Sequence, residues 1–319
     1  MTYKAIDEVI DILSRGTAPL WIASGEWKYI NQHHKQGYIE LLQNRNYREL
    51  REVLCKLFDE PISYGLITPV FQNAESQEHA DTFLQDLALF QDIHPGYSLE
   101  HLRHQFLPSH RYSKFTEPYS CFPDSPRHAH TALQIINLAN NFGFGLEIGG
   151  GYGGQAFYLK RFGFLGKILI CDLLETLIIA YIFLRGQDLN VALCFNHEEF
   201  LEAAEKSIEV ILFTPNVLFD LQRIQGLAFF INSRSLSEMN QIDSFKYLNL
   251  INDKLKPPIL FLENAEILAF PNSERHTEIV QKDLQNQLFN YSLQSNSPSL
   301  FSGGDMRYSE RIYLLTETL

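Results

Sequence analysis

Two acidic residues and a run of glycines lie close together near the middle of this sequence, at a spacing that can bind a nucleoside. Glu147 stands two residues before Gly149, and Gly149, Gly150, Gly151, Gly153 and Gly154 follow it closely. Asp172 comes directly after the next apolar run, 167–171. Glycines let the backbone take positive φ and approach a ligand, and an acid at a second strand end can accept both hydroxyls of a ribose. The stretch 145–175 therefore predicts strand, tight turn, helix and second strand around a nucleoside-containing cofactor.

The glycine spacing fits two kinds of cofactor. Gly149, Gly151 and Gly154 match the fingerprint of dinucleotide sites, whereas Glu147, Gly149, Gly151 and Gly153 match the glycine loop of methyltransferases that use S-adenosylmethionine (SAM). The pyrophosphate of a dinucleotide would be repelled by Glu147, while the sulfonium and ammonium groups of SAM would be attracted. We therefore expect SAM. The alternatives are an NAD(P)-dependent oxidoreductase of sugars, a non-catalytic binding module, and a glycine-rich connection that binds nothing.

Helical and strand-like segments alternate after residue 126. The expected strands are 145–148, 167–171, 191–195, 209–213, 228–231 and 259–262, followed by a terminal pair at 289–293 and 311–316. Helices are expected at 155–162, 175–186, 197–206, 245–255 and 274–288. This alternation predicts an α/β, Rossmann-like SAM-methyltransferase fold, with a mostly parallel sheet and an antiparallel pair at the C-terminus.

The first 125 residues have a different, mostly helical pattern. Apolar residues recur at helical spacing at 6–13, 38–58, 80–93 and 99–106. The segment 107–126 has no periodicity and predicts a long loop, of the kind that serves as a lid or a linker. At its end, Ser125 and Pro126 predict a helix start, with the helix reaching about residue 141. We expect a helical accessory region over 1–125 that shapes the acceptor pocket, and a SAM-binding domain over 126–319.

The candidate site residues follow from these elements. Glu147, Gly149, Gly151, Gly153 and Gly154 are expected to hold the methionine end of SAM. The remaining cofactor candidates are Asp172 and Glu175 at the ribose, and Asn232 after the strand expected to face the methyl group.

Methyl transfer to a hydroxyl needs a positioned acceptor and a group that removes its proton. The candidates for this base are Glu238, His128 and His130. Each has a plain structural alternative, since Glu238 can cap a helix and the chain has 11 histidines. No spacing typical of a metal site is present in the sequence, so no metal ligands are assigned, and a magnesium site built from separated residues stays an alternative.

Composition narrows the class of protein. The 319 residues are 45% hydrophobic, enough for a substantial core, and carry a formal net charge of −12. A basic stretch that could follow a phosphate backbone is absent from the sequence, so nucleic acid is not expected as a partner. The 4 cysteines are widely separated. The sequence shows neither a signal peptide nor a membrane-spanning run. We expect a cytoplasmic protein with reduced thiols; the sequence allows a homo-oligomer without defining one.

Several segments resemble one known family. LEIGGGYGG (146–154), CDLLETL (171–177) and FFINSRSLSEMN (229–240) are similar to segments of the sugar O-methyltransferases, a SAM-dependent family found near bacterial polysaccharide genes. The resemblance covers about residues 120–255, and RYSERIYLLT (307–316) is a further match. The family has proline where this chain has Leu174. The resemblance implies methyl transfer from SAM to a hydroxyl of a sugar or glycoside in polysaccharide biosynthesis.

Overall fold

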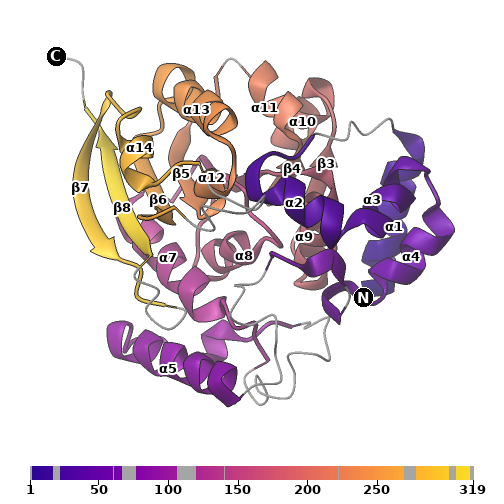
Figure 1. Ribbon diagram of the computed structural model, residues 1–319, viewed down its shortest axis with the longest axis horizontal. Coiled ribbons are helices and arrows are strands. Elements are labelled where there is room, and N and C mark those ends of the chain that lie inside the picture. The colour runs from indigo at the N-terminus through magenta and orange to yellow at the C-terminus, as the bar shows by residue number, and fades with distance from the viewer. Residues whose placement is uncertain are drawn as a thin grey trace.

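The computed structural model describes residues 2–16, 22–59, 61–66, 77–105, 120–139, 141–221, 223–268, 278–301 and 307–316. Most of the predicted loop 107–126 and the start of the predicted helix 274–288 therefore lie outside the described residues. A sheet of 8 strands runs through the molecule in the order β3-β4-β2-β1-β5-β6-β8-β7. In Figure 1 the β7–β8 hairpin forms one edge of the molecule, and helices α1, α3 and α4 gather on the opposite side.

The sheet is parallel except at its C-terminal edge, as the sequence predicts. The parallel strands are β1 (Phe144–Ile148), β2 (Lys167–Cys171), β3 (Val191–Cys194), β4 (Val210–Phe213), β5 (Leu227–Ser233) and β6 (Ile259–Ala265). The last two, β7 (Tyr291–Pro298) and β8 (Tyr308–Leu315), pair antiparallel with each other, and β8 pairs antiparallel with β6. The predicted Rossmann-like fold class is confirmed.

Side chains that alternate along the strands build a core on each face of the sheet. Ile168 and Ile170 of β2 belong to one buried cluster, and Leu169 and Cys171 belong to the other. This is the expected result for a strand buried on both faces, because successive side chains point in opposite directions. One face is covered by α7 (Ser125–Leu138), α8 (Gly154–Arg161) and α9 (Leu174–Gly186), and the other by α10 (His197–Glu205), α11 (Pro215–Asp220), α13 (Gln241–Leu250) and α14 (Gln281–Gln285).

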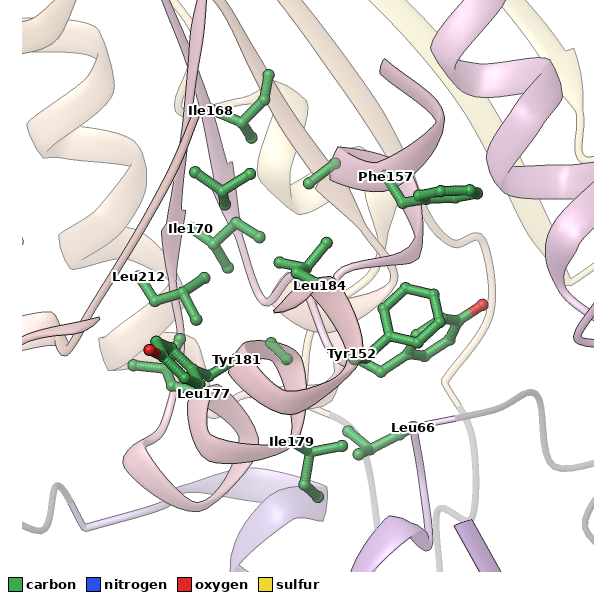
Figure 2. Close-up of a cluster of buried hydrophobic side chains, with 14 of the residues drawn as sticks. Leu66, Tyr152, Phe157, Ile168, Ile170, Leu177, Ile179, Tyr181, Leu184 and Leu212 are labelled. Carbon is green, nitrogen blue, oxygen red and sulfur yellow. The ribbon is translucent and has the colours of Figure 1, made fainter. Parts of the chain in front are cut away.

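The N-terminal helices pack onto the first of these faces. They are α1 (Thr2–Arg15), α2 (Gly25–His33), α3 (Gln36–Gln43), α4 (Tyr47–Leu54) and α5 (Gln77–Ile93). The buried apolar side chains of α1, α3, α4 and α5 belong to the same cluster as those of α9 and one face of β2, and Trp27 of α2 packs against this cluster. Figure 2 shows this continuity, with Leu66 from the N-terminal part of the chain beside Ile179 of α9. The division into two regions at residue 125 remains a prediction.

Two of the predicted N-terminal helices differ from the structure. The periodic stretch 38–58 is not one helix but α3 and α4, because Arg45 takes a left-handed φ of 52° and Asn46 caps the second helix by accepting from the Glu49 N–H. The stretch 99–106 contains a 3₁₀ turn over Leu99–Leu102. At the start of α7 the N-cap is Asp124, one residue earlier than predicted.

Candidate functional site

The turn between β1 and α8 depends on its glycines. Gly149, Gly151 and Gly153 have φ of 72°, 56° and 86°, a region that favours glycine. A Cβ on Gly149 would lie 2.0 Å from the hydroxyl oxygen of Ser235, whereas one on Gly151 would meet nothing within 4 Å. The turn is thus pressed against the loop after β5 at one end and open to a cavity at the other.

Two carboxyl groups flank this turn, as the sequence predicts: Glu147 is buried and Asp172 is half-buried. Glu147 is 3% exposed at the end of β1, and burial together with the nearby Asp172 carboxylate raises its pKa to about 8, against the lowering influence of Arg127. Burial raises the pKa of Asp172 to about 7, although it accepts hydrogen bonds from the N–H of Leu173 at 2.7 Å and of Gly151 at 3.0 Å. A cation that entered between the two groups would favour their ionised forms.

A cavity of about 230 Å³ opens at the carboxyl ends of the strands. The cavity lies at the end of β1, which has β2 on one side and β5 on the other. The strand order reverses at this point of the sheet, and open α/β sheets bind ligands at such a reversal. The walls come from the glycine turn, the ends of β2 and β5, the start of α7 and the N-terminal helix α2. The lining includes Trp27, Asp124, Arg127, His128, Glu147, Gly149, Gly151, Asp172, Ser235, Glu238, Tyr247, Arg307 and Tyr308.

Helix α2 forms part of the cavity wall. The indole Nε1–H of Trp27 donates to Oε2 of Glu238 at 2.8 Å, and both residues line the cavity. A Cβ on Gly25 would lie 2.2 Å from the carbonyl oxygen of Glu238, so the start of α2 lies directly against this segment. Lys35 lies with its Nζ 4.7 Å from the centroid of the Trp27 ring. The N-terminal half therefore supplies part of the cavity wall.

A buried ion cluster supports the wall between α7 and β5. Glu263, the last residue of β6 to pair with β5, is fully buried and accepts from Arg127 Nη1 at 2.8 Å and from Arg234 Nη2 at 2.9 Å. Burial alone would raise the pKa of Glu263, but Arg234 and Arg127 hold it well below its ordinary value. Asp124 lies 3.8 Å from Arg127, so two arginines meet two carboxylates.

Arg127, Arg234 and Glu263 were not among the site residues predicted from the sequence. The available signal was the position of Glu263, an acid at the end of a third parallel strand and therefore at the same edge of the sheet as Glu147. A second indication is the left-handed φ of 72° at Arg234, which is a property of the folded backbone and cannot be read from the sequence.

His128 and His130 do not lie together. His128 lines the cavity, but its Nε2 accepts from Arg127 at 3.0 Å, and burial, followed by the charge of Arg127, lowers its pKa well below the ordinary value. His130 is not part of the lining and instead contacts His94 at 2.9 Å. Residues two apart on a helix point in different directions, so one helix cannot present both to one cavity. Glu238 is the predicted base that lies in the cavity with an oxygen held by a neighbouring donor.

Two predicted cofactor residues lie behind the cavity wall rather than on it. Glu175 is buried and accepts from Asn31 Nδ2 at 2.5 Å, and Tyr38 donates to its carbonyl oxygen at 3.0 Å. Asn232 donates to the carbonyl of Ile148 at 2.9 Å and accepts from Asn264 at 3.0 Å. Both side chains are used to hold neighbouring elements, because their polar groups are already engaged within the protein. The expectation of direct cofactor contact does not fit these positions.

Neither a metal-binding cluster nor a membrane-spanning helix is found among the described residues. In the parts of the chain that the structure describes, His, Cys, Asp and Glu side chains form no group of three or more able to hold a metal ion. Within the same ranges, the helices are too short or too polar to cross a bilayer.

No protein-family model and no curated protein sequence matches the chain. Several solved structures resemble part of its fold. The magnesium protoporphyrin IX methyltransferase ChlM from Synechocystis PCC 6803, solved with bound SAM, is 12% identical with a TM-score of 0.40, and the match covers 60% of this chain and 78% of that one. The N-methyltransferase NodS from Bradyrhizobium japonicum WM9, solved with S-adenosylhomocysteine, is 10% identical with a TM-score of 0.40, covering 61% and 89%.

The small RNA methyltransferase HEN1 is 15% identical with a TM-score of 0.44, and the match covers 61% of this chain but 25% of that protein. Likeness at this level concerns the arrangement of helices and strands and identifies neither a ligand nor a reaction.

Proposed function

We propose that the protein is a SAM-dependent O-methyltransferase that methylates a hydroxyl of a sugar or glycoside. The observation that carries the proposal is a pair of carboxyl groups, the buried Glu147 and the half-buried Asp172, on either side of the glycine turn in one cavity. SAM brings a sulfonium and an ammonium group to such a turn, and both are matched by carboxylates. Asp172 at the second strand end is placed for the ribose hydroxyls.

The same geometry disfavours a dinucleotide. A pyrophosphate at this turn needs free backbone N–H donors, yet the Gly151 N–H already donates to Asp172 Oδ2 at 3.0 Å. A phosphate would also bring negative charge close to Glu147, whose ionised form burial and Asp172 already disfavour, whereas a cationic ligand would favour that form. The alternative of an NAD(P)-dependent oxidoreductase therefore has less support than methyl transfer.

Glu238 is the group that we assign to the acceptor hydroxyl. In the proposed step the acceptor oxygen forms a bond to the SAM methyl carbon while the carbon–sulfur bond breaks. The bonding electrons leave with sulfur as a neutral thioether, and the hydroxyl proton passes to the Glu238 carboxylate. Trp27 fixes one oxygen of this carboxylate through its indole N–H. His128 cannot easily accept the proton, because Arg127 already donates to its Nε2.

Two observations support the proposal that the methyl acceptor is a sugar. The segments that resemble the sugar O-methyltransferases include the glycine turn and the short helix α12 (Ser235–Glu238) that carries Glu238. Outside the turn, the cavity wall combines aromatic rings with carboxylates, namely Trp27, Tyr308, Glu26 and Glu238. Such side chains can pack against a sugar ring and accept hydrogen bonds from its hydroxyls. We place this reaction in cytoplasmic polysaccharide biosynthesis.

Two experiments test the proposal. Thermal shift assays compare SAM, S-adenosylhomocysteine and NAD, since a ligand that binds only the native state raises its stability. We expect both adenosyl sulfur compounds, and not NAD, to raise the melting temperature. Methyl-labelled SAM is then incubated with the protein and fractionated cell-surface glycans, and label is expected in a glycan fraction. Stabilisation by NAD alone would contradict the proposal.

A further inference from the structure

Lys35, the residue that precedes α3, is a buried cation whose ammonium group forms no hydrogen bond with the described part of the chain. It is 1% exposed, and its Nζ has no hydrogen-bond partner there. Glu175 of α9 and Asp172 at the end of β2 influence its charge through space. A buried ammonium group is costly unless other groups compensate it, so the position of Lys35 requires a contact of another kind.

That contact is the ring of Trp27. The Nζ of Lys35 lies 4.7 Å from the centroid of the indole, within the range of a cation–π interaction. The Nε1–H of the same indole donates to Glu238 Oε2 at 2.8 Å. A positive charge over the ring draws electron density from it, and linked polar contacts strengthen one another in a protein interior. The indole N–H therefore donates more strongly to Glu238 while Lys35 is charged.

We propose that Lys35 is a positioning residue, whose ammonium group acts through Trp27 to hold the Glu238 carboxylate in the orientation that accepts the proton of the acceptor hydroxyl. This inference rests on the proposed function, under which Glu238 is the base. It extends that function by giving a role to a residue that does not line the cavity and that belongs to the N-terminal part of the chain.

The charge of Lys35 depends on pH. Burial lowers the pKa of Lys35 to about 8, against the raising influence of Glu175 and Asp172. Tyr38 of α3, which donates to the carbonyl oxygen of Glu175, stays neutral in this range, because burial raises its pKa well above the ordinary value. Lys35 is therefore charged below about pH 8 and neutral above it, so its effect on Glu238 should fade as pH rises through that value.

Tryptophan fluorescence tests the contact without any methyl transfer. The chain has 2 tryptophans, so Trp21→Phe leaves Trp27 as the sole emitter. In this background the emission of Trp27 should change in one step near pH 8, as Lys35 loses the charge beside the ring. Lys35→Met in the same background should remove the step. Lys28→Met is the matched control, because Lys28 is an exposed lysine next to Trp27 on α2, and the step should remain.

Kinetics test the effect on Glu238. Transfer of label to the glycan fraction that accepts it is measured at saturating SAM, whose positive charge favours the ionised forms of Glu147 and Asp172. Lys35→Met should lower kcat at neutral pH by roughly fivefold to thirtyfold, the strength of a desolvated cation–π contact, with little change in SAM affinity. The wild-type kcat should fall as pH rises through about 8, whereas Lys35→Arg, which stays charged, should remain active there.

A double variant shows whether Lys35 acts through Trp27. Trp27→Phe keeps an aromatic ring but has no N–H to donate to Glu238. Adding Lys35→Met to Trp27→Phe should therefore cause no further loss in kcat. A further loss as large as in the wild-type background would overturn the inference.

The results separate this inference from the proposed function. Absence of the fluorescence step near pH 8, or a wild-type kcat in Lys35→Met, would overturn the role of Lys35 and leave methyl transfer in place. A loss confined to SAM affinity would also overturn it, because Lys35 would then serve Asp172 and not Glu238. If NAD binds and SAM does not, both proposals fail. Circular dichroism checks folding; if Lys35→Met is unfolded, the fluorescence step and the pH profile of proteins that keep Lys35 decide the matter.

Discussion

Replacing Glu147 by glutamine removes a buried carboxyl group from the end of β1 while keeping its size. The variant is informative because the group has opposite effects on folding and on binding. Burial and the neighbouring Asp172 raise the pKa of Glu147 to about 8, so the folded protein without ligand holds this carboxyl group protonated at neutral pH. The unfolded chain ionises it at its ordinary value of 4.5. Folding therefore requires the uptake of a proton between these two values.

The sign of the pH dependence follows directly. A carboxyl group whose folded pKa is raised binds more protons in the folded state, so stability falls as pH rises from the unfolded to the folded pKa. Each pH unit inside that window costs the wild type about 1.4 kcal/mol. The glutamine variant does not bear this cost. Its stability relative to wild type should therefore increase by about 1.4 kcal/mol for each pH unit between about pH 5.5 and 7.5.

Thermal melts across this pH range measure the effect. With a shift of about 2 °C for each kcal/mol, the difference in melting temperature between variant and wild type should widen by about 3 °C per pH unit. Glu202→Gln is the control, since Glu202 lies on the surface beside Lys206. Its difference from wild type should not widen with pH.

The same variant should bind SAM poorly. A ligand at a hundred times its dissociation constant stabilises the wild type by about 2.7 kcal/mol, and glutamine cannot offer the ammonium group a negative charge. We expect Glu147→Gln to be the more stable protein without SAM and to gain little when SAM is added. A stability difference that is independent of pH would refute the protonated state of Glu147. Unchanged SAM binding would refute its role in attracting a cation.

Three further predictions concern other parts of the site. Asp172→Ala should abolish the rise in melting temperature that SAM causes, because the ribose loses its acceptor, and the protein without ligand should remain folded; unchanged stabilisation by SAM would contradict this. Glu238→Gln should lower methyl transfer from labelled SAM by about a hundredfold or more while SAM affinity in calorimetry stays the same, and Trp27→Phe should reduce transfer less; loss of SAM affinity in either variant would argue against an acceptor-side role. Glu263→Gln should destabilise the protein by about 3 to 5 kcal/mol in urea unfolding, since two buried arginines lose their shared carboxylate; a loss below about 1 kcal/mol would show that the ion cluster contributes little.

Local sequence patterns were sufficient to predict most of the sheet. The strand 167–171 has the predicted bounds, because its apolar run is bounded by glycine on one side and an acid on the other. The glycine turn was equally readable, since positive φ at Gly149, Gly151 and Gly153 restricts the residue type. The bounds of this strand and the conformation of the turn depend on residues that are neighbours in the chain, so both can be predicted from a single sequence.

The acceptor side could not be predicted, because it is assembled from distant segments. Trp27 and Glu238 are 211 residues apart, and no pattern in either segment indicates that one donates to the other. The Arg127–Glu263 contact joins residues 136 positions apart. The burial of a side chain also cannot be read from the local sequence. Glu147 was expected to attract a cation, but its protonated state without ligand depends on the surrounding structure.

The charge of the cavity bears on how the proposed reaction would end. SAM enters with a positive sulfonium, and methyl transfer converts it to a neutral thioether. In the described part of the wall, Asp172 and Glu147 have their pKa values raised chiefly by burial, and Glu263 holds Arg127 and Arg234 in ion pairs. Ionised carboxylates near the turn would therefore lose their favourable interaction with the positive sulfonium when the methyl group is transferred. Reprotonation of one of them would remove this imbalance at neutral pH, because their pKa values of about 8 and about 7 lie close to it. The raised pKa values, which reduce the stability of the protein without ligand, would in this way allow a carboxylate of the site to take up a proton when the cofactor loses its positive charge.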